Sequence, residues 1–325
     1  MTAMDLTQAS VVVTGGAGFL GTHVVRTLRE RGACRIAVPR SAEYDLTDAV
    51  ATNRLFEETK PNLVIHLAAR VGGIGANRKH PGTFFRDNVL MGVNVIEAAR
   101  IHGVAKTVVA GTICAYPKFA PVPFKEDDLW NGFPEETNAA YGIAKKSLLV
   151  MSQAYRQEFG LNIVVVFPVN LYGPADNFDL EASHVIPAMI RKFVDANTRG
   201  EDVVTLWGDG TPTREFLYVS DAGEALVTAA ERYDDGAPVN VGAGFEISMA
   251  DLSIKIAAAC NYKGRVQWDA SRPNGQPRRM LDVTRAKERF GWSASISLDE
   301  GLQRTIAWYR EHAFRHDARG AASLT

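Results

Sequence analysis

A doubly wound α/β fold with a parallel sheet, the Rossmann arrangement, is predicted by two features of this sequence. Short apolar runs rich in β-branched residues alternate with amphipathic stretches through the first 170 residues, and such runs are typical of strands buried on both faces of a parallel sheet. A glycine-rich turn follows the first run directly. In such a fold, ligands bind at the carboxyl ends of the strands. The expected strands are residues 10–15, 35–39, 63–69, 107–112 and 162–170, and the expected helices are residues 19–31, 48–59, 85–102 and 141–159.

The pattern changes after residue 170, where polar loops rich in Pro, Asn and Gly interrupt shorter apolar elements. We therefore predict two lobes. Residues 1–170 are expected to form a dinucleotide-binding domain to which later elements near residues 214–235 return, and residues 171–315 are expected to form mainly a substrate-binding lobe. The polar end of the chain, residues 316–325, is predicted to be a disordered tail.

The composition argues against nucleic acid and membranes as partners. The formal net charge of -1 provides no positive field that would attract nucleic acid or an anionic membrane. No apolar run reaches the roughly 18 residues that a membrane helix needs, and the N-terminus lacks the basic and apolar regions of a signal peptide. The three cysteines are far apart and fit neither a disulfide framework nor a zinc site, so we expect a cytoplasmic location and no metal.

The segment VVVTGGAGFLGTHVV joins the first strand to the first helix and carries Gly15, Gly18 and Gly21 in the spacing G-x-x-G-x-x-G. This context predicts a dinucleotide site, because Gly15 permits a tight turn and Gly18 lets the backbone approach a pyrophosphate at the helix N-terminus. Gly21 allows the helix to pack closely on the strand. Phe19 and Leu20 begin the helix and are expected to contact the same cofactor. A glycine-rich turn without a ligand is the alternative.

The end of the second strand decides between NAD and NADP. An NAD site has an acidic residue there for the ribose hydroxyls, whereas an NADP site has an arginine for the 2′-phosphate. The sequence AVPRSAEYDLTD places Arg40 there with no acid directly after the strand, so we predict NADP(H); a solvated surface arginine is the alternative. Asp45 and Leu46 are expected to flank the adenine. Ala68 and Pro168, near the ends of the third and fifth strands, are further candidate cofactor contacts.

The sequence YGIAK places Tyr141 and Lys145 four residues apart, on one face of an expected helix. A tyrosine with a pKa of about 10 is a poor acid–base catalyst at neutral pH, and a neighbouring ammonium group favours its phenolate form. The lysine is also expected to hold the nicotinamide ribose. Such a pair occurs by chance in many helices, but after four strand–helix units and a dinucleotide turn it indicates a dehydrogenase site.

Together these features resemble the extended short-chain dehydrogenase/reductase family over nearly the whole chain. The resemblance implies that a Ser or Thr after the fourth strand hydrogen-bonds the substrate carbonyl and completes the catalytic set with the tyrosine and the lysine. Thr112 holds that position in GTICAYP. A cap at the end of the strand is the structural alternative for Thr112.

Cys114 follows Thr112 by two residues, so it would face the same cleft if strand geometry persists to residue 114; a small buried hydrophobe is the default interpretation of such a cysteine. Several segments resemble the GDP-L-fucose synthase family of GDP-4-keto-6-deoxy-mannose 3,5-epimerase–4-reductases. They are HLAARVGGIGANRKHP, YPKFAPVPFKEDDL, PVNLYGPADNF, SHVIPAMIRKF, WGDGTPTREFLYVSD and DASRPNGQPRRMLDVTR. The resemblance implies that Cys114 and His184 are the acid and base of epimerisation. A satisfied core or loop histidine is the alternative for His184.

The resemblance also implies how a GDP-linked 4-keto sugar is bound. Lys192, Arg214 and Arg279 occupy positions that bind substrate in the family, and Trp207 is a further contact. Asn170, in the P-x-N-L-Y-G-P motif, is expected to contact substrate or cofactor. Solvated surface is the alternative for each of the three basic residues. Relatives further suggest a homodimer formed by the helices 85–102 and 141–159.

The predicted reaction is 3,5-epimerisation of a GDP-4-keto-6-deoxyhexose followed by NADPH-dependent reduction at C4. One alternative is a GDP-sugar 3,5-epimerase without net redox change that makes another L-sugar, and one of a different class is a non-catalytic NADP-binding module. Departures from the family bear on the sugar and the cofactor. The family commonly reads G-S-S-C-I-Y-P where this chain has GTICAYP, Lys192 replaces an arginine, and Ser41 stands where members often have an arginine.

Overall fold

A six-stranded parallel sheet forms the centre of the larger of two lobes in this computed structural model, which describes residues 4–72, 74–180, 183–272 and 274–322. The strands lie in the order β10-β5-β4-β3-β1-β2, and every neighbouring pair is parallel. Both β3 and β4 are buried along their whole length, as expected for central strands of a parallel sheet that is covered on both faces. The bounds are β1 Ser10–Thr14, β2 Arg35–Ala37, β3 Leu63–His66, β4 Lys106–Ala110, β5 Ile163–Pro168 and β10 Val239–Val241.

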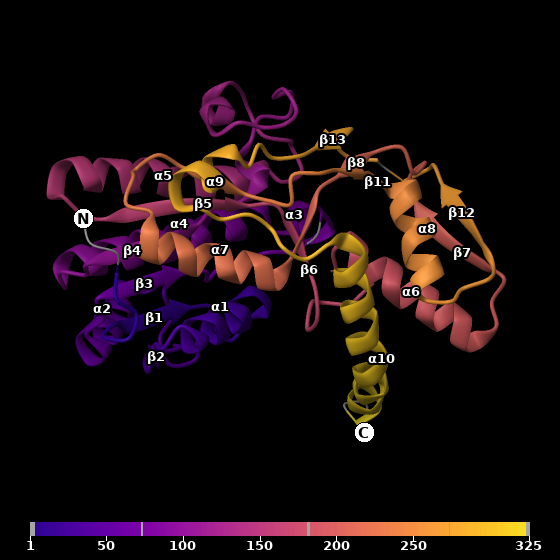
Figure 1. Cartoon of the computed structure of the whole chain (residues 1–325), viewed down its shortest axis with the longest axis horizontal. Helices are drawn as coiled ribbons and strands as arrows, with labels where there is room; N and C mark the ends of the chain where they lie inside the picture. Colours follow the sequence, from indigo (N-terminus) through magenta and orange to yellow (C-terminus); the bar gives the residue numbers. More distant parts are fainter. Residues whose placement is uncertain (1–3, 73, 181–182, 273, 323–325) are drawn as a thin grey trace.

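Helices cover both faces of this sheet (Figure 1). On one face α1 (Phe19–Glu30) packs against α7 (Val219–Arg232), and on the other α4 (Pro81–Ile101) packs against α2 (Ala49–Thr59) and α5 (Ala139–Phe159). Right-handed crossovers explain the positions of α1, α2, α4 and α5, because the chain moves in one direction from β1 to β2 and in the opposite direction from β2 to β3, β4 and β5. The predicted doubly wound α/β fold is confirmed.

The order of the strands reverses at β1, whose neighbours are β2 on one side and β3 on the other. The loop after β1 leads to α1 on one face of the sheet and the loop after β3 leads to α4 on the other, so a crevice lies between these two loops, which is where such folds bind ligands. The glycine turn after β1 and the loops after β3, β4 and β5 all reach this edge, and α3 (Ile74–Lys79) lies within the loop after β3.

The smaller lobe has a hydrophobic core of its own, and Figure 1 shows it beside the large sheet, with α10 projecting away. Its helices are α6 Val185–Arg199, α8 Met249–Ala259 and α10 Leu298–Ala322, and its parallel strands are β7 Val203–Trp207 and β12 Arg265–Asp269. Its core includes Phe193 of α6, Ile256 of α8 and Leu302 of α10.

Short strands lie between the two lobes. β6 pairs with β9, and β8 pairs with both β11 and β13. The chain then returns to the larger lobe, where α7 packs on α1, β10 completes the main sheet, and α9 (Thr284–Phe290) packs against β10. The larger lobe thus draws on residues beyond the predicted return near 214–235. The bounds are β6 Asn170–Tyr172, β8 Thr213–Arg214, β9 Phe216–Tyr218, β11 Ile247–Ser248 and β13 Arg278–Arg279.

Helix α10 extends into the segment that was predicted to be a disordered tail. Helix α10 continues to Ala322, so most of residues 316–325 are helical, and residues 323–325 lie outside the described residues. This segment contains three alanines and one arginine, and both residue types are strong helix formers. A helix that tertiary packing has already nucleated extends readily through such residues.

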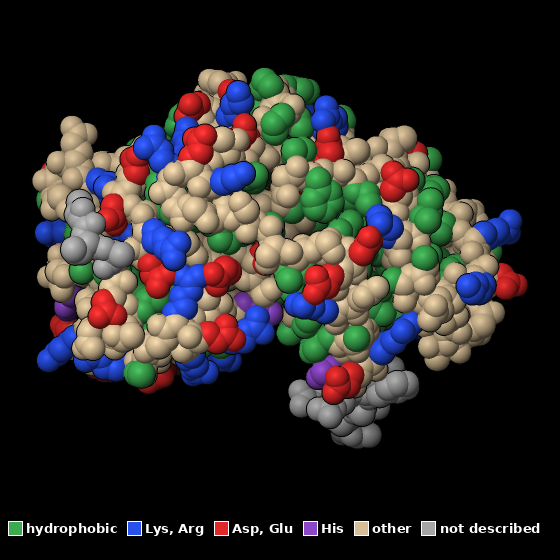
Figure 2. Space-filling model, in the orientation of Figure 1, with side chains coloured by type: hydrophobic (Ala, Val, Ile, Leu, Met, Phe, Trp, Pro, Cys, Tyr) green, Lys and Arg blue, Asp and Glu red, His purple; other side chains and the backbone are tan. Residues whose placement is uncertain are grey.

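The face drawn in Figure 2 carries lysine and arginine interspersed with aspartate and glutamate. Across the described ranges, no helix is both long and apolar enough to cross a bilayer. The same ranges contain no group of three or more histidine, cysteine, aspartate or glutamate side chains placed to hold a metal ion.

Candidate active site

A cavity of about 1030 Å³ lies between the two lobes at the carboxyl ends of the central strands. One wall comes from the loops after β1, β2, β3, β4 and β5, and the other from α6, β7, β8 and β13. Every residue that the sequence predicted for the site lines this cavity. They are Gly15, Gly18, Phe19, Leu20, Gly21, Arg40, Asp45, Leu46, Ala68, Thr112, Cys114, Tyr141, Lys145, Pro168, Asn170, His184, Lys192, Trp207, Arg214 and Arg279.

The glycine turn permits close backbone approach. Gly15 has a φ of +71°, which side chains disfavour, and a Cβ there would lie 2.8 Å from the backbone nitrogen of Ala68. A Cβ on Gly21 would lie 2.1 Å from the carbonyl oxygen of Gly15, so a larger residue would push α1 off the turn. Gly18 precedes α1 in an extended conformation and provides no side-chain cap. The first N–H groups of α1 are therefore available to an anionic ligand.

The residues after β2 line the cavity next to this turn. Arg40 is exposed, and Leu46 is buried. Asp45 accepts hydrogen bonds from the backbone nitrogen (2.9 Å) and the hydroxyl (2.8 Å) of Thr47, which hold the pKa of its carboxyl below the usual value. Arg70, which no prediction included, also lines the cavity and pairs with the buried carboxylate of Asp87.

Tyr141 and Lys145 project from the first turns of α5. Both side chains are buried, and Nζ of Lys145 has no hydrogen-bond partner among the described atoms. Burial lowers the pKa of Lys145 to about 8. Burial also raises the pKa of Tyr141 well above its usual value; the neighbouring Cys114 adds to this rise, and a hydrogen bond with Thr112 opposes it. Burial therefore favours the protonated form of the Tyr141 phenol.

The residues after β4 do not continue the predicted strand 107–112. β4 ends at Ala110, and Ile113–Ala115 form a 3-10 turn that Thr112 caps through a hydrogen bond from the backbone nitrogen of Cys114 to Oγ1 (3.2 Å). A continuing strand, the premise that placed Cys114 beside Thr112, is thus wrong. The turn nonetheless directs the half-buried Cys114 into the cavity.

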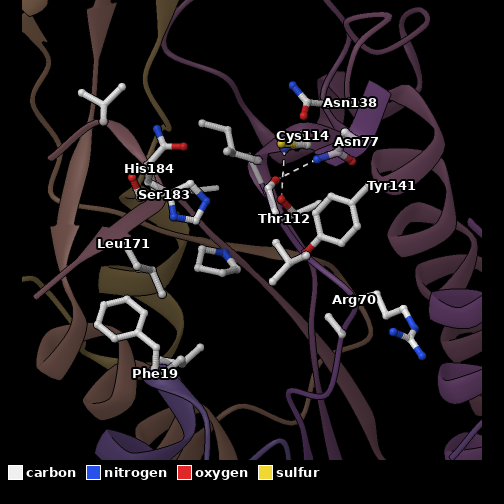
Figure 3. Close-up of a pocket in the computed structure, with 18 of the residues that line it drawn as sticks. Phe19, Arg70, Asn77, Thr112, Cys114, Asn138, Tyr141, Leu171, Ser183 and His184 are labelled. Atoms are coloured by element: carbon white, nitrogen blue, oxygen red, sulfur yellow. Dashed lines mark hydrogen bonds between the residues drawn. The ribbon is translucent and has the colours of Figure 1, made fainter. Parts of the chain in front are cut away.

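His184 reaches the same cavity from the smaller lobe. It lies directly before α6 as the N-cap residue, and Figure 3 shows its ring across the cavity from Thr112 and Tyr141. The ring is accessible from the cavity but enclosed by the surrounding protein, and this desolvation lowers its pKa. A neutral imidazole on this side can exchange a proton with a ligand that lies between it and the thiol.

Three predicted cations line the smaller lobe's side of the cavity. Lys192 donates a hydrogen bond to the carbonyl oxygen of Thr205 (2.8 Å), and Arg214 donates one to that of Thr213 (2.7 Å). Desolvation lowers the pKa of Lys192 and lowers that of Arg214 to about 10. Arg279 instead contacts Cys114, through Nη1 and Sγ at 3.9 Å.

Trp207 and Asn170, two further predicted contacts, differ in how much of each side chain is available to a ligand. The ring of Trp207 is largely exposed on the cavity wall, and the guanidinium of Arg272 lies 5.0 Å from its centroid. Such an open aromatic face is suited to stacking with a planar ring. Nδ2 of Asn170 donates to the backbone oxygen of Glu215 (3.1 Å), so this amide also joins β6 to β9 beneath the cavity.

Sequence reasoning missed several polar side chains of the cavity. Oγ of Ser183 is buried and has no hydrogen-bond partner among the described atoms. Asn77 is buried and lies beside Cys114 in Figure 3. Gln276 is also buried and hydrogen-bonded to Arg279 (2.7 Å). The segments that contain these residues were recognised, but no spacing rule distinguishes one amide or hydroxyl within them.

Known proteins resemble this chain in sequence over most of its length. The NAD dependent epimerase/dehydratase family matches residues 11–242. GDP-L-fucose synthase 1 of Arabidopsis thaliana is 39% identical over 309 residues, which cover 95% of each chain. The GDP-L-fucose synthase of Escherichia coli is 37% identical over 319 residues, which cover 95% of this chain and 99% of that one.

Solved structures agree in fold along nearly the whole chain. A GDP-L-fucose synthetase from Naegleria fowleri bound to NADP has a TM-score of 0.86 at 28% identity, covering 96% of this chain and 97% of that one. A GDP-6-OMe-4-keto-L-xylo-heptose reductase from C. jejuni has a TM-score of 0.88 at 25% identity, covering 95% of this chain and 99% of that one. The chain therefore belongs to the NAD dependent epimerase/dehydratase family, the extended short-chain dehydrogenases/reductases, and within it to the group of the GDP-L-fucose synthases.

Proposed function

We propose that this chain is an NADP-dependent enzyme that inverts C3 and C5 of a GDP-4-keto-6-deoxyhexose and then reduces the C4 ketone. One observation carries the proposal. A single cavity holds two hydroxyl groups, on Thr112 and Tyr141, together with the thiol of Cys114 and the imidazole of His184, beside a dinucleotide turn. The relatives named GDP-L-fucose synthase support a GDP-sugar as the substrate class.

The residues of the cavity fit NADP(H). Side chains are excluded at Gly15 and Gly21, which is the condition for a pyrophosphate to approach the backbone at the start of α1. Nζ of Lys145 has no hydrogen-bond partner among the described atoms, and ribose hydroxyls would provide one. Arg40 lines the cavity, and its guanidinium would bind a 2′-phosphate. When bound, the reduced nicotinamide supplies the hydride for C4. The NADP in the N. fowleri relative supports this choice of cofactor.

Epimerisation needs an acidified carbon and proton-transfer groups on both faces of the sugar. The C4 ketone delocalises the charge that forms when a proton leaves C3 or C5, and hydrogen bonds from Thr112 and Tyr141 stabilise that charge on oxygen. Cys114 and His184 approach from different sides, so one removes a proton and the other returns one. Thiols and imidazoles ionise at about pH 8.5 and 6.5, near the pH at which general acid–base catalysis is efficient.

Reduction uses the same contacts to the ketone oxygen. Burial keeps the phenol of Tyr141 protonated, so Tyr141 donates its proton to the C4 oxygen as that oxygen gains charge. Lys145 provides a buried cation near the phenol and stabilises the phenolate that remains. The same two hydroxyl donors therefore serve an enolate during epimerisation and an alkoxide during reduction.

The GDP moiety is assigned to the wall of the smaller lobe. Trp207 offers an exposed ring for the base, and Lys192 and Arg214 offer cations for the diphosphate. Both cations already donate to backbone carbonyls, so their remaining donors serve the substrate. This arrangement leaves the sugar between His184 and the turn that carries Cys114.

Incubation with GDP-4-keto-6-deoxymannose and NADPH tests the function, with the products identified by NMR. We expect stoichiometric loss of NADPH absorbance and a product inverted at C3 and C5. Epimers formed without loss of NADPH would replace the proposal by a non-redox GDP-sugar 3,5-epimerase. NADP binding without turnover of any GDP-sugar would indicate a non-catalytic module.

We further propose that the protein is a homodimer in the cytoplasm. α4 and α5 pack side by side and expose large apolar side chains that a second copy would cover. They are Phe85, Leu90, Val93, Ile101, Val150 and Phe159. All three cysteines are free thiols, which is compatible with a reducing compartment. Light scattering of the purified protein tests the dimer, and a monomer mass at micromolar concentration would refute it.

A further inference from the structure

We propose that Arg279 serves the thiol of Cys114 rather than the diphosphate of the substrate, by stabilising the negative charge that forms on sulfur when Cys114 gives up its proton. The proposal rests on the proposed function of this site. It reassigns Arg279, which the sequence predicted as a substrate contact. Its starting point is the hydrogen bond that Nη1 of Arg279 donates to Sγ of Cys114 at 3.9 Å.

The guanidinium of Arg279 is held in this position by Gln276. Nε of Arg279 donates to Oε1 of Gln276 at 2.7 Å, and Nε2 of Gln276 donates to the carbonyl oxygen of Lys118 at 2.7 Å. Gln276 is only 6% exposed, and both ends of its amide are used. Lys118 belongs to the loop that leaves the Cys114 turn, so Gln276 fixes the guanidinium relative to the segment that carries the thiol.

The backbone of Arg279 is held as firmly as its side chain. The residue lies in β13, paired with β8, and its carbonyl oxygen accepts from the backbone nitrogen of Glu215 at 3.0 Å. The carboxylate of Glu215 accepts in turn from the backbone nitrogen of Leu281 at 2.6 Å. Glu215 is fully buried. The backbones of Arg279 and Leu281 are thus both tied to Glu215, and the guanidinium can point at the sulfur without help from a substrate.

Within the part of the chain that the structure describes, no carboxylate pairs with the guanidinium of Arg279. None of the ion pairs within the described ranges involves Arg279, whereas its neighbour Arg278 pairs with Glu246. A hydrogen bond from a charged donor strengthens when its acceptor becomes an anion, so this contact favours the ionised sulfur. The thiolate accepts the proton that leaves carbon while the C–H electron pair enters the enolate, and no oxidant or reductant is required. Arg279 therefore acts through Cys114, as a positioning and charge-stabilising residue.

Alkylation of Cys114 by iodoacetamide tests this assignment without substrate. A Cys34→Ser background removes the exposed cysteine, and Cys260 is buried. Because the thiolate is the form that reacts, we expect Arg279→Gln to slow alkylation at neutral pH by about tenfold or more, the effect of losing one charge-assisted hydrogen bond. Arg279→Lys should restore part of the rate. Arg278→Gln is the matched control, and its rate should equal that of the background protein.

A second variant tests the same proposal if Arg279→Gln does not fold. Gln276→Leu leaves the arginine in place but removes its support, so we expect a smaller decrease in the alkylation rate with NADPH binding retained. Unchanged alkylation in folded Arg279→Gln overturns the proposal, and loss of GDP affinity in that variant would then return Arg279 to the diphosphate. Thiol reactivity requires no turnover, so this outcome is separate from failure of the proposed reaction.

Discussion

Oγ1 of Thr112 accepts a hydrogen bond from the backbone nitrogen of Cys114 at 3.2 Å, so one hydroxyl caps the turn after β4 and orients the residue that carries the thiol. Because the hydroxyl acts as an acceptor in this bond, it can still donate its own hydrogen to a substrate carbonyl. The two interpretations of Thr112 from sequence, a structural cap and a carbonyl contact, are therefore compatible with each other.

Two replacements of Thr112 distinguish the effect of its hydroxyl group from the effect of its side-chain shape. Thr112→Val keeps the volume but removes both hydrogen bonds, so we expect both proton exchange and reduction to slow by about 100-fold or more and the free energy of unfolding to fall by about 1 kcal/mol. Thr112→Ser keeps the hydroxyl and should stay within a few-fold of the wild-type rate. Steady-state kinetics and urea unfolding measure these effects. A Thr112→Val enzyme with the wild-type rate would remove Thr112 from the catalytic set.

Gly142 makes room for the turn that carries Cys114. A Cβ on Gly142 would lie 2.2 Å from the carbonyl oxygen of Cys114, so Gly142→Ala must displace either α5 or the turn. We expect a loss of about 1–3 kcal/mol in the free energy of unfolding and a loss of activity, because α5 also carries Tyr141. Gly82→Ala is the matched control, since a Cβ there meets nothing within 4 Å. Equal stability of the two variants would contradict the close approach.

The sequence predicted the larger lobe well because its signals are local. Short apolar runs identify β3 and β4, whereas the glycine spacing and the four-residue separation of Tyr141 and Lys145 predict where the cofactor and the phenol lie. The turn after β4 could not be predicted, since its cap depends on a hydrogen bond to Thr112 rather than on an apolar period. The contact between Gln276 and Lys118 joins residues far apart in sequence, and no local pattern reports it.

Arg40 tests the choice of cofactor. If its guanidinium binds the 2′-phosphate, Arg40→Ala should weaken NADPH binding by about tenfold or more and leave NADH binding nearly unchanged, because NADH lacks that phosphate. Arg29→Ala is the matched control: it removes an exposed arginine at the far end of α1, outside the cavity. Fluorescence titration with both cofactors measures the ratio. An equal loss of affinity for NADPH and NADH would show that Arg40 does not bind the 2′-phosphate.

We expect the free energy of unfolding to depend on pH because of Lys145. Burial lowers its pKa from 10.5 to about 8, so the folded protein binds this proton less tightly than the unfolded chain. The buried ammonium therefore destabilises the fold by about 3 kcal/mol below pH 8, and this penalty disappears as the pH rises to 10.5. Lys145→Met, which carries no charge, should exceed the wild type in stability by the largest margin below pH 8. Urea unfolding across this range, without cofactor, measures the difference, and a margin independent of pH would contradict the shifted pKa.

Cys114 and His184 can be separated from Tyr141 by the step that each variant loses. If thiol and imidazole exchange protons with C3 and C5, Cys114→Ser and His184→Ala should suppress incorporation of deuterium from D2O at these carbons, measured by NMR of the recovered sugar. Tyr141→Phe loses the proton donor for the C4 oxygen, so hydride transfer should fall by about 100-fold or more while NADPH still binds.

The three residues line one cavity, so a variant that merely distorts the site would lose both proton exchange and hydride transfer. A variant that loses only one of these two steps therefore identifies the role of the replaced residue. Deuterium incorporation that survives in both Cys114→Ser and His184→Ala would show that other groups move the protons. Cys114 and His184 would then be wall residues of a reductase, and the turn that Thr112 caps would serve only to shape the pocket. Loss at one carbon in one variant and at the other carbon in the second would instead assign a separate base to each centre.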